Sequence, residues 1–318
     1  MKQRGVALII VLLVVAFVAV IAIEMAGRLQ LQVKRTSNIK DSKQAYWYAM
    51  GAEAYARKTI AQLLQEEDPL NINQPWAQDS IMFPMPNGGI EAELMDMQSC
   101  FNLDALQKDD TQNSKAQEKS AFERLLQTDT LEIPPLSVET VRDTTMDWLD
   151  SDTIPDGTYG VEDSEYESLL NPYLAANGLM VSKSEFRLVK GVEPAWIGRV
   201  MPFLCVIPGK TDLQINVNTI HQDRAPLLAA LLGTSEADAQ NLIRNVPYKD
   251  KAAFLATTEV SALNLTQEQQ DWFVAETEYF ILSVKSRYNN ASFAMSSLLK
   301  IDSENKVTTV RREFGGKI

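Results

Sequence analysis

Apolar residues run without interruption from Val6 to Ile23, near the start of the chain. As an α-helix, this run of eighteen residues is about 27 Å long, which matches the apolar core of a lipid bilayer. From Glu24 to Asp68 there is no proline, and apolar residues recur at spacings of three and four until Leu63. This pattern predicts one helix of about sixty residues, whose first part crosses a membrane and whose second part packs on a globular domain.

The residues that flank the apolar run favour a retained anchor over a discarded signal peptide. Lys2 and Arg4 precede the run, which favours a cytoplasmic N-terminus. A cleaved secretory signal has a shorter apolar region and small residues before the cut, whereas a cut after Ala26 would put Glu24 at a small-residue position. The alternative to one long helix is an anchor followed by a separate helix, with a break near residues 35–41.

Alternating apolar and polar residues predict strands in two distant parts of the chain. Residues 89–98, "GIEAELMDMQ", read as a strand that follows a turn-rich stretch. Residues 278–288, 292–302 and 306–314 are β-rich and are joined by the short links "NNA" and "SEN", which predicts an antiparallel meander. An extended pattern also returns at residues 213–219, "LQINVNT".

Helical patterns fill the chain between these β segments. They cover roughly residues 117–128, 136–149, 164–176, 182–190, 223–233, 235–245 and 250–256. The polar run that begins at Gln107, "QKDDTQNSKAQEKS", has the composition of a loop. Helices placed between β segments indicate an α+β fold with a large helical insertion.

Composition narrows the classes of function. The 318 residues carry a net charge of −12, which argues against nucleic acid or an anionic membrane surface as partners of the soluble part. The chain has a single histidine, His221, and no P-loop, dinucleotide fingerprint or nucleophile elbow, so an enzyme is not expected. The two cysteines, Cys100 and Cys205, are far apart in sequence and do not have the spacing of zinc ligands. They predict a disulfide if the soluble part lies outside the cytoplasm, or two buried thiols if it lies inside.

Residues 214–255 are similar to helix-hairpin-helix modules that bind DNA phosphates. Such modules need a glycine-flanked hairpin and nearby basic residues. The hairpin here, "LLGTSEADAQ", has one glycine and two acidic residues. A packing unit of two or three helices is therefore favoured over a DNA-binding module.

The first five residues, "MKQRG", are followed at once by the apolar run and then by an unbroken amphipathic helix. This arrangement resembles a type IV pilin or a type II secretion pseudopilin. The resemblance implies that a prepilin peptidase cuts after Gly5 and methylates Val6. Pilin-like subunits usually carry a glutamate at the fifth mature position, which is Ile10 here, and its loss resembles the K-type minor pseudopilins. A buried carboxylate is costly unless a neighbouring subunit's terminal ammonium pairs with it, so a subunit with no neighbour above it needs none.

The resemblance extends through "FNLDAL", "INVNT" and the terminal meander, and so covers nearly the whole chain. It implies a pilin-like α+β fold, in which a long N-terminal helix packs on an antiparallel sheet and a helical domain is inserted. The expected division is a leader (1–5), the transmembrane part of the helix (6–23), the pilin-like helix and first strands (24–104), the inserted helical domain (105–212), a helical packing segment (213–275) and the C-terminal meander (276–318). A disulfide between Cys100 and Cys205 is expected to join the first strand to the region before "INVNT".

The function implied by the resemblance is structural. The chain would be a single-pass protein of the bacterial inner membrane, with its N-terminus in the cytoplasm and its soluble region in the periplasm. At the tip of the type II secretion pseudopilus it would cap or initiate assembly with I-type and J-type minor pseudopilins, and through them with the H-type and major pseudopilins, to support protein export. Two alternatives are a signal-anchored periplasmic calcium-binding protein that does not polymerise, and a minor tip pilin of a type IV pilus or DNA-uptake system.

An acidic run gives the strongest chemical signal in the chain. Between Asp143 and Glu167 there are nine carboxylates and no lysine or arginine, which requires a cation or free exposure to water. Oxygen ligands favour calcium, but an EF-hand does not fit, because Ile154 occupies the third position counted from Asp152. K-type pseudopilins carry calcium in their helical domain beside patterns like "DWLDSD" and "GVED". The resemblance implies the ligands Asp150, Asp152 and Glu162, with Asp147 and Asp163 behind them.

Overall fold

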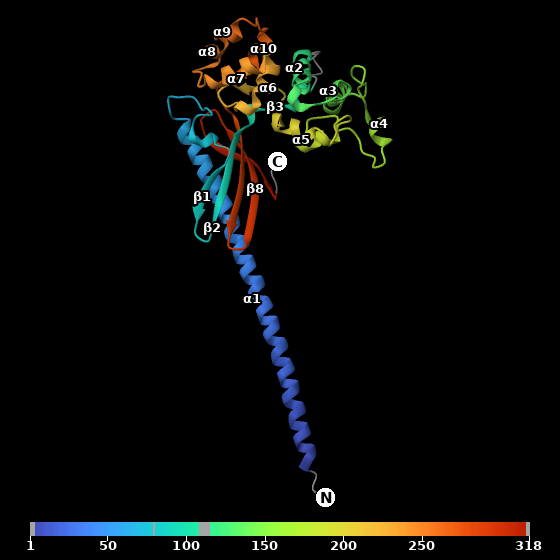
Figure 1. The fold of residues 1–318 in the computed structure, drawn as a ribbon, viewed down its shortest axis with the longest axis vertical. Helices are drawn as coiled ribbons and strands as arrows, with labels where there is room; N and C mark the ends of the chain where they lie inside the picture. Colours follow the sequence, from blue (N-terminus) through green and yellow to red (C-terminus); the bar gives the residue numbers. More distant parts are fainter. Residues whose placement is uncertain (1–3, 79, 108–114, 316–318) are drawn as a thin grey trace.

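The computed structural model describes residues 4–78, 80–107 and 115–315. The first three residues of the expected leader, most of the polar loop that follows Gln107, and the last three residues of the chain lie outside the described residues. The fold has three parts, which are a long stem helix, a five-stranded sheet packed on the upper part of that helix, and a group of helices above the sheet (Figure 1).

Helix α1 is continuous from Arg4 to Leu63. The prediction of one helix of about sixty residues is therefore confirmed, and the alternative with a break near residues 35–41 is wrong. Within the described residues α1 is the one helix that is long and apolar enough to cross a membrane. Its lower part extends away from the other described elements and is exposed (Figure 1), whereas Ala45, Ala49 and Ile60 are fully buried against the sheet. Small side chains on this stripe allow the helix to lie close to the strands.

The sheet is antiparallel, with the strand order β1-β2-β7-β8-β9. Its strands are β1 (Ile81–Met85), β2 (Gly88–Asp96), β7 (Tyr279–Tyr288), β8 (Ala291–Ile301) and β9 (Val307–Phe314). The predicted first strand and the C-terminal meander are confirmed. Strand β1 was not predicted, since Pro84 interrupts its short run; a proline is tolerated there because β1 is an edge strand.

The helical part lies at the end of the sheet farthest from the N-terminus (Figure 1). It contains α2 (Ala116–Leu126), α3 (Pro135–Leu149), α4 (Asp163–Glu167), α5 (Ile197–Val200), α6 (Ala225–Leu232), α7 (Glu236–Arg244), α8 (Lys251–Leu255), α9 (Thr258–Ser261) and α10 (Gln267–Asp271). One continuous apolar core runs through these helices, and a separate core lies between α1 and the sheet.

Two predicted helices differ in the structure. The prediction of a helix over residues 164–176 is wrong beyond Glu167, because Pro172 has no amide hydrogen to donate and the backbone amide of Ala175 instead donates to the Asp163 carboxylate. The prediction over residues 182–190 becomes a short 3₁₀ helix, Lys183–Leu188, which a capping box between Ser182 and Glu185 opens. Both segments are irregular connections around α3.

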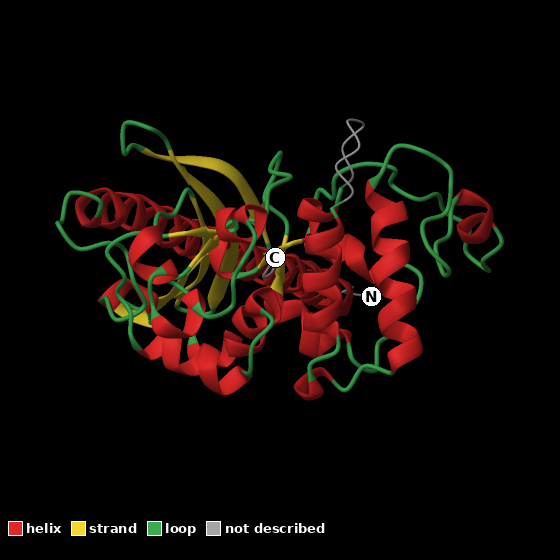
Figure 2. Cartoon of the chain, turned by 90° about the horizontal axis from the view of Figure 1, so that it is seen from above, coloured by secondary structure: helices red, strands yellow, loops and turns green. Residues whose placement is uncertain are grey.

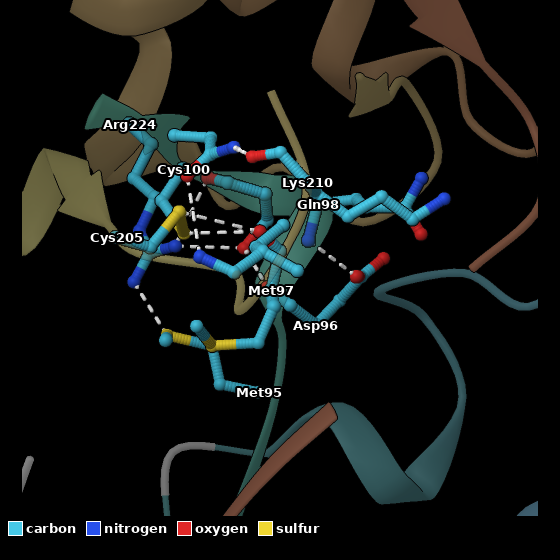
Figure 3. The surroundings of a disulfide bond; sticks show 11 residues. Met95, Asp96, Met97, Gln98, Cys100, Cys205, Lys210 and Arg224 are labelled. Atoms are coloured by element: carbon cyan, nitrogen blue, oxygen red, sulfur yellow. Dashed lines mark hydrogen bonds between the residues drawn. A yellow bond between two sulfur atoms is a disulfide. The ribbon is translucent and has the colours of Figure 1, made fainter. Parts of the chain in front are cut away.

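The sheet and the helical part are joined at the end of β2. Cys100 and Cys205 form a disulfide with their Cα atoms 5.8 Å apart (Figure 3). Beside it the buried Asp96 carboxylate accepts hydrogen bonds from Thr219 and Thr277, at 2.6 and 2.5 Å, and from the backbone amide of Gln98. Two short parallel pairings reinforce the junction, between β3 (Phe101–Asn102) and β4 (Leu204–Cys205) and between β5 (Ile215–Asn216) and β6 (Phe273–Val274).

Candidate calcium centre and anchor helix

The acidic run forms the C-terminal end of α3 and the loop between α3 and α4. Asp147 lies in the last turn of α3, Asp150 caps that helix, and Glu162 stands immediately before α4. All three carboxylates are buried, with residue exposures of 0, 3 and 7%. Figure 2, which looks down on the molecule, places this loop and the strands of the sheet at opposite sides of the view.

The loop brings these carboxylates into two groups that share Asp150. One group contains Asp147, Asp150 and Asp156, and the other contains Asp150, Asp152 and Glu162. Within each group one oxygen from every residue lies within 4.8 Å of the others. This spacing suits a cation that bridges several oxygens, and hard oxygen donors of this kind select calcium or a similar ion.

Several buried oxygens in the two groups have no hydrogen-bond donor within the described residues. They include Oδ2 of Asp147 and both carboxylate oxygens of Glu162. A buried acceptor without a donor is costly, and a buried charge without a partner is costlier still. The residues therefore fit a bound cation, which would supply the missing positive charge to these oxygens.

The pKa values of Asp147 and Glu162 support the same conclusion. Burial raises the pKa of Asp147 to about 7, and the neighbouring charges of Glu162 and Asp156 add to the rise. Burial also raises the pKa of Glu162 to about 7, together with the charges of Asp150 and Asp152. The protein alone therefore disfavours the ionised form of both groups, and a divalent ion would reverse that preference.

Each predicted ligand has a defined place. Asp147, Asp150, Asp152 and Glu162 belong to the two groups, whereas Asp163 belongs to neither. The Asp163 carboxylate instead accepts the backbone amide of Ala175. Sequence reasoning missed Asp156 as a member of the first group. The signal was available, because Asp156 precedes a glycine in "PDG", a turn that folds the chain back over α3.

Two glycines let the loop approach the α3 carboxylates. The backbone amide of Asp156 donates to Asp147 at 2.8 Å, and the amide of Gly160 donates to the carbonyl of Asp156 at 3.1 Å. A Cβ atom on Gly160 would collide with Asp147 and with the Asp156 backbone. Gly157 has a φ of +65°, a conformation that favours glycine.

The residues predicted for processing lie at the start of α1. Gly5 is in the first turn, while Val6 and Ile10 follow on the exposed lower part of the helix. Between the apolar run and the part of α1 that packs on the sheet, further large apolar side chains are more than half exposed, and these are Met25, Leu29, Leu31, Val33 and Ile39. Such a stripe outside a bilayer core is typical of a surface that another chain covers.

Comparison with known proteins gives concordant results. Residues 99–209 and 215–276 match two sequence families, each described as "Type II secretion system (T2SS), protein K". The chain is 34% identical to the type II secretion system protein K of Aeromonas hydrophila, over 99% of this chain and 98% of that protein, and 32% identical to that of Klebsiella pneumoniae, over 99 and 97%.

A solved structure is also similar. It is described as the crystal structure of the GspK-GspI-GspJ complex from the type 2 secretion system of enterotoxigenic Escherichia coli. The TM-score is 0.78 at 28% sequence identity, and the match covers 89% of this chain and 100% of that chain. The likeness therefore extends over most of the chain.

Proposed function

Because the chain belongs to the type II secretion system protein K family and is a minor pseudopilin of that system, we propose that it lies at the tip of the periplasmic pseudopilus. There it caps or initiates assembly together with I-type and J-type minor pseudopilins, and through them with the H-type and major subunits. A similar chain crystallised in a complex with GspI and GspJ, which supports these partners.

The observation that supports a position at the tip is the location of the helical part relative to the stem and the sheet. The stem and sheet have the form of a stackable subunit, but the helical part extends beyond the sheet on the side away from the stem (Figure 1). A further subunit stacked above would meet this helical part instead of a stem helix. Ile10 is consistent with the same position, since it offers no carboxylate to the terminal ammonium of a neighbour.

Photo-crosslinking from two positions tests the tip position. A photoreactive residue replaces Trp47, which is 63% exposed on α1 at the level of the sheet, or Glu259, which is exposed on α9 at the far end. In cells that assemble the pseudopilus, the probe at Trp47 is expected to capture I-type or J-type subunits, and the probe at Glu259 is expected to capture no pseudopilin. Equal capture of pseudopilins from both positions contradicts a tip subunit.

The stem requires a second proposal, on processing and topology. The prepilin peptidase removes residues 1–5 on the cytoplasmic side of the inner membrane and methylates Val6, and the rest of α1 holds the soluble region in the periplasm. The exposed apolar side chains of the stem then pack on the stems of neighbouring subunits. Mass spectrometry of the membrane form tests this proposal: a mature chain that begins at methylated Val6 is expected, and an intact Met1 contradicts it.

The loop between α3 and α4 is proposed to bind calcium through Asp147, Asp150, Asp152, Asp156 and Glu162. The ion supplies positive charge to this group of carboxylates, in which Oδ2 of Asp147 and both oxygens of Glu162 have no donor among the described residues. Trp148 provides the test, since it follows Asp147 and its ring lies 5.4 Å from that of Tyr166, in the helix that follows Glu162. Addition of calcium chloride to the chelator-treated chain is expected to change tryptophan fluorescence saturably. Unchanged fluorescence together with an unchanged melting temperature would contradict the proposal.

A further inference from the structure

Asp143 belongs to the acidic run but differs from its neighbours in the surroundings of its carboxylate. It lies in α3, one turn before Asp147, and is fully buried. Lys119 of α2 and Arg142 both reach its Oδ1, each at 2.9 Å, and a second guanidinium nitrogen of Arg142 reaches Oδ2 at 3.2 Å. Two cations therefore already satisfy this carboxylate, and it belongs to neither group of candidate calcium ligands.

The same carboxylate holds the middle of the loop. Its Oδ2 accepts the backbone amides of Thr158 and Tyr159, at 3.3 and 3.4 Å. These residues directly follow Gly157, whose Cβ position would lie 2.5 Å from Oδ2, so the turn rests closely on Asp143. The contact fixes the loop immediately after Asp156, one of the candidate ligands.

We propose that Asp143 is a positioning residue for the calcium loop, which folds residues 156–159 onto α3 before any ion binds. The acidic run then has two parts with different roles. Asp143, neutralised by Lys119 and Arg142, holds the loop, whereas the carboxylates of the two candidate groups take the ion. A loop that is already folded loses less conformational freedom when calcium binds, so the affinity is higher. This inference rests on the proposed calcium site.

The first test removes the negative charge of Asp143 and keeps the shape of its side chain. In the full-length chain in detergent, Asp143→Asn leaves the ligands untouched but removes the anion that Lys119 and Arg142 face. The loss of a positioning group beside a metal site typically weakens metal affinity about 10–100-fold, and a loss of at least about tenfold is expected here. Calcium affinity is measured from the change in tryptophan fluorescence, to which Trp148 contributes, and by calorimetry with calcium chloride alone.

A second variant acts from the other side of the contact. Gly157→Ala keeps every charge, and its site is exposed, so the chain is expected to fold. The added methyl group displaces the turn from Asp143, and calcium affinity is expected to fall as in Asp143→Asn. The matched control is Glu123→Gln, which removes the 2.8 Å ion pair with Arg142 in the same network. Among the described residues, Glu123 forms no hydrogen bond or ion pair with the loop. This control is expected to keep the wild-type affinity.

Two readouts separate positioning from a general loss of stability. A purely structural role would lower the melting temperature equally with and without calcium, whereas a positioning role reduces the increase in melting temperature that calcium causes. Hydrogen exchange of the Thr158 and Tyr159 amides in the chelator-treated wild type is expected to be slow, and it is expected to become fast in both variants.

The possible outcomes distinguish failure of the calcium site from failure of the positioning role of Asp143. If wild type binds no calcium, the proposed calcium site and this inference both fail. If wild type binds calcium and Asp143→Asn and Gly157→Ala bind it equally well, the positioning role alone fails. Equal weakening by Glu123→Gln also overturns the role, because the effect would then belong to the α2–α3 ion network. Fast exchange of both amides in the calcium-free wild type excludes a loop that folds before the ion binds.

Discussion

Two regions of the molecule bury carboxylates in opposite ways. Glu53 of α1 is 1% exposed. Its two carboxylate oxygens accept hydrogen bonds from the hydroxyl groups of Ser297 and Thr309 and from Nε and Nη2 of Arg312, at 2.6–2.9 Å. Burial alone would raise the pKa of Glu53, but the hydrogen bonds and the charge of Arg312 hold it below its ordinary value. The carboxylate is therefore stable in its ionised form.

At the other end of the molecule, Asp147 and Glu162 are also buried, but their pKa values are raised to about 7. The difference lies in the donors. The sheet supplies a cation and hydroxyl groups to Glu53, whereas the acidic loop supplies further carboxylates to Asp147 and Glu162. Burial alone therefore does not distinguish a candidate metal site. The acidic loop differs from the surroundings of Glu53 because it gathers several carboxylates and includes buried oxygens that have no donor among the described residues.

The largest expected effect follows from the removal of the cation beside Glu53. Arg312→Met leaves the ionised Glu53 buried with only the hydroxyl groups of Ser297 and Thr309 as close donors among the described residues. Because the Arg312 side chain is itself 38% exposed, the cost is expected at the lower end of the range for a broken buried pair, about 3 kcal/mol of unfolding free energy. The loss should be the same with calcium and with chelator, because the acidic loop is not involved. Chemical denaturation of the soluble region within the full-length chain measures it.

A double variant and a surface control make this prediction sharper. Glu53→Met with Arg312→Met removes both charges, and most of the lost stability should return. The exposed pair between Lys251 and Asp271 gives the contrast, since Lys251→Met should cost under about 1 kcal/mol. A double variant as unstable as Arg312→Met alone would contradict the assigned role of the ion pair.

The next effect concerns the link between the two regions. The Cys100–Cys205 disulfide closes a loop of 105 residues that contains the whole acidic run. Its replacement by two serines is expected to cost about 2–4 kcal/mol, because the unfolded chain regains freedom. The helical part should also unfold at lower temperature than the sheet, so that calorimetry resolves two transitions and calcium shifts only the first. A single transition that calcium shifts as a whole would contradict this separation.

Pattern alone predicts the regular parts of the fold well. Helix α1 follows from an unbroken period, and β7, β8 and β9 follow from alternation with short polar links, since local sequence decides such elements. The sequence does not predict β1, because its pairing with β2 compensates for Pro84. Pro172 in the sequence argues against a helix that runs to residue 176, but the exact end at Glu167 does not follow from it, since that also depends on the contact between Asp163 and Ala175.

The candidate site is predictable to the level of residue type and not beyond it. The excess of acids between residues 143 and 167 shows in the sequence, and Asp150, Asp152 and Glu162 do lie together. However, the sequence places Asp143 and Asp147 in the same run without distinguishing them. Lys119, which separates their roles, is 24 residues before Asp143 in sequence and meets it only because α2 packs on α3.

Removal of calcium is expected to have an intermediate effect, confined to one region. If the ion is present at about 100 times its dissociation constant, it stabilises the folded chain by about 2.7 kcal/mol. Chelator should therefore lower the stability of the helical part by this amount and leave the sheet unchanged. Glu162→Gln should abolish most of this calcium dependence. It should also stabilise the calcium-free chain near pH 8, because it removes a buried charge for which the described residues supply no donor.

The smallest effect is a pH dependence that separates the two regions without mutation. In the calcium-free chain, folding raises the pKa values of Asp147 and Glu162 from their ordinary values of 3.8 and 4.5 to about 7. The folded chain then holds protons that the unfolded chain releases, so stability falls as the pH rises from about 4 towards 7.

Burial raises the pKa values of Asp96 and Asp104 only to about 6, and both groups keep this dependence when calcium is bound. The increase in melting temperature caused by calcium should therefore be larger at pH 8 than at pH 6, by an amount equivalent to about 1.4 kcal/mol for each of the two groups that releases its proton between these pH values. An increase that is equal at both pH values would contradict proton competition at Asp147 and Glu162.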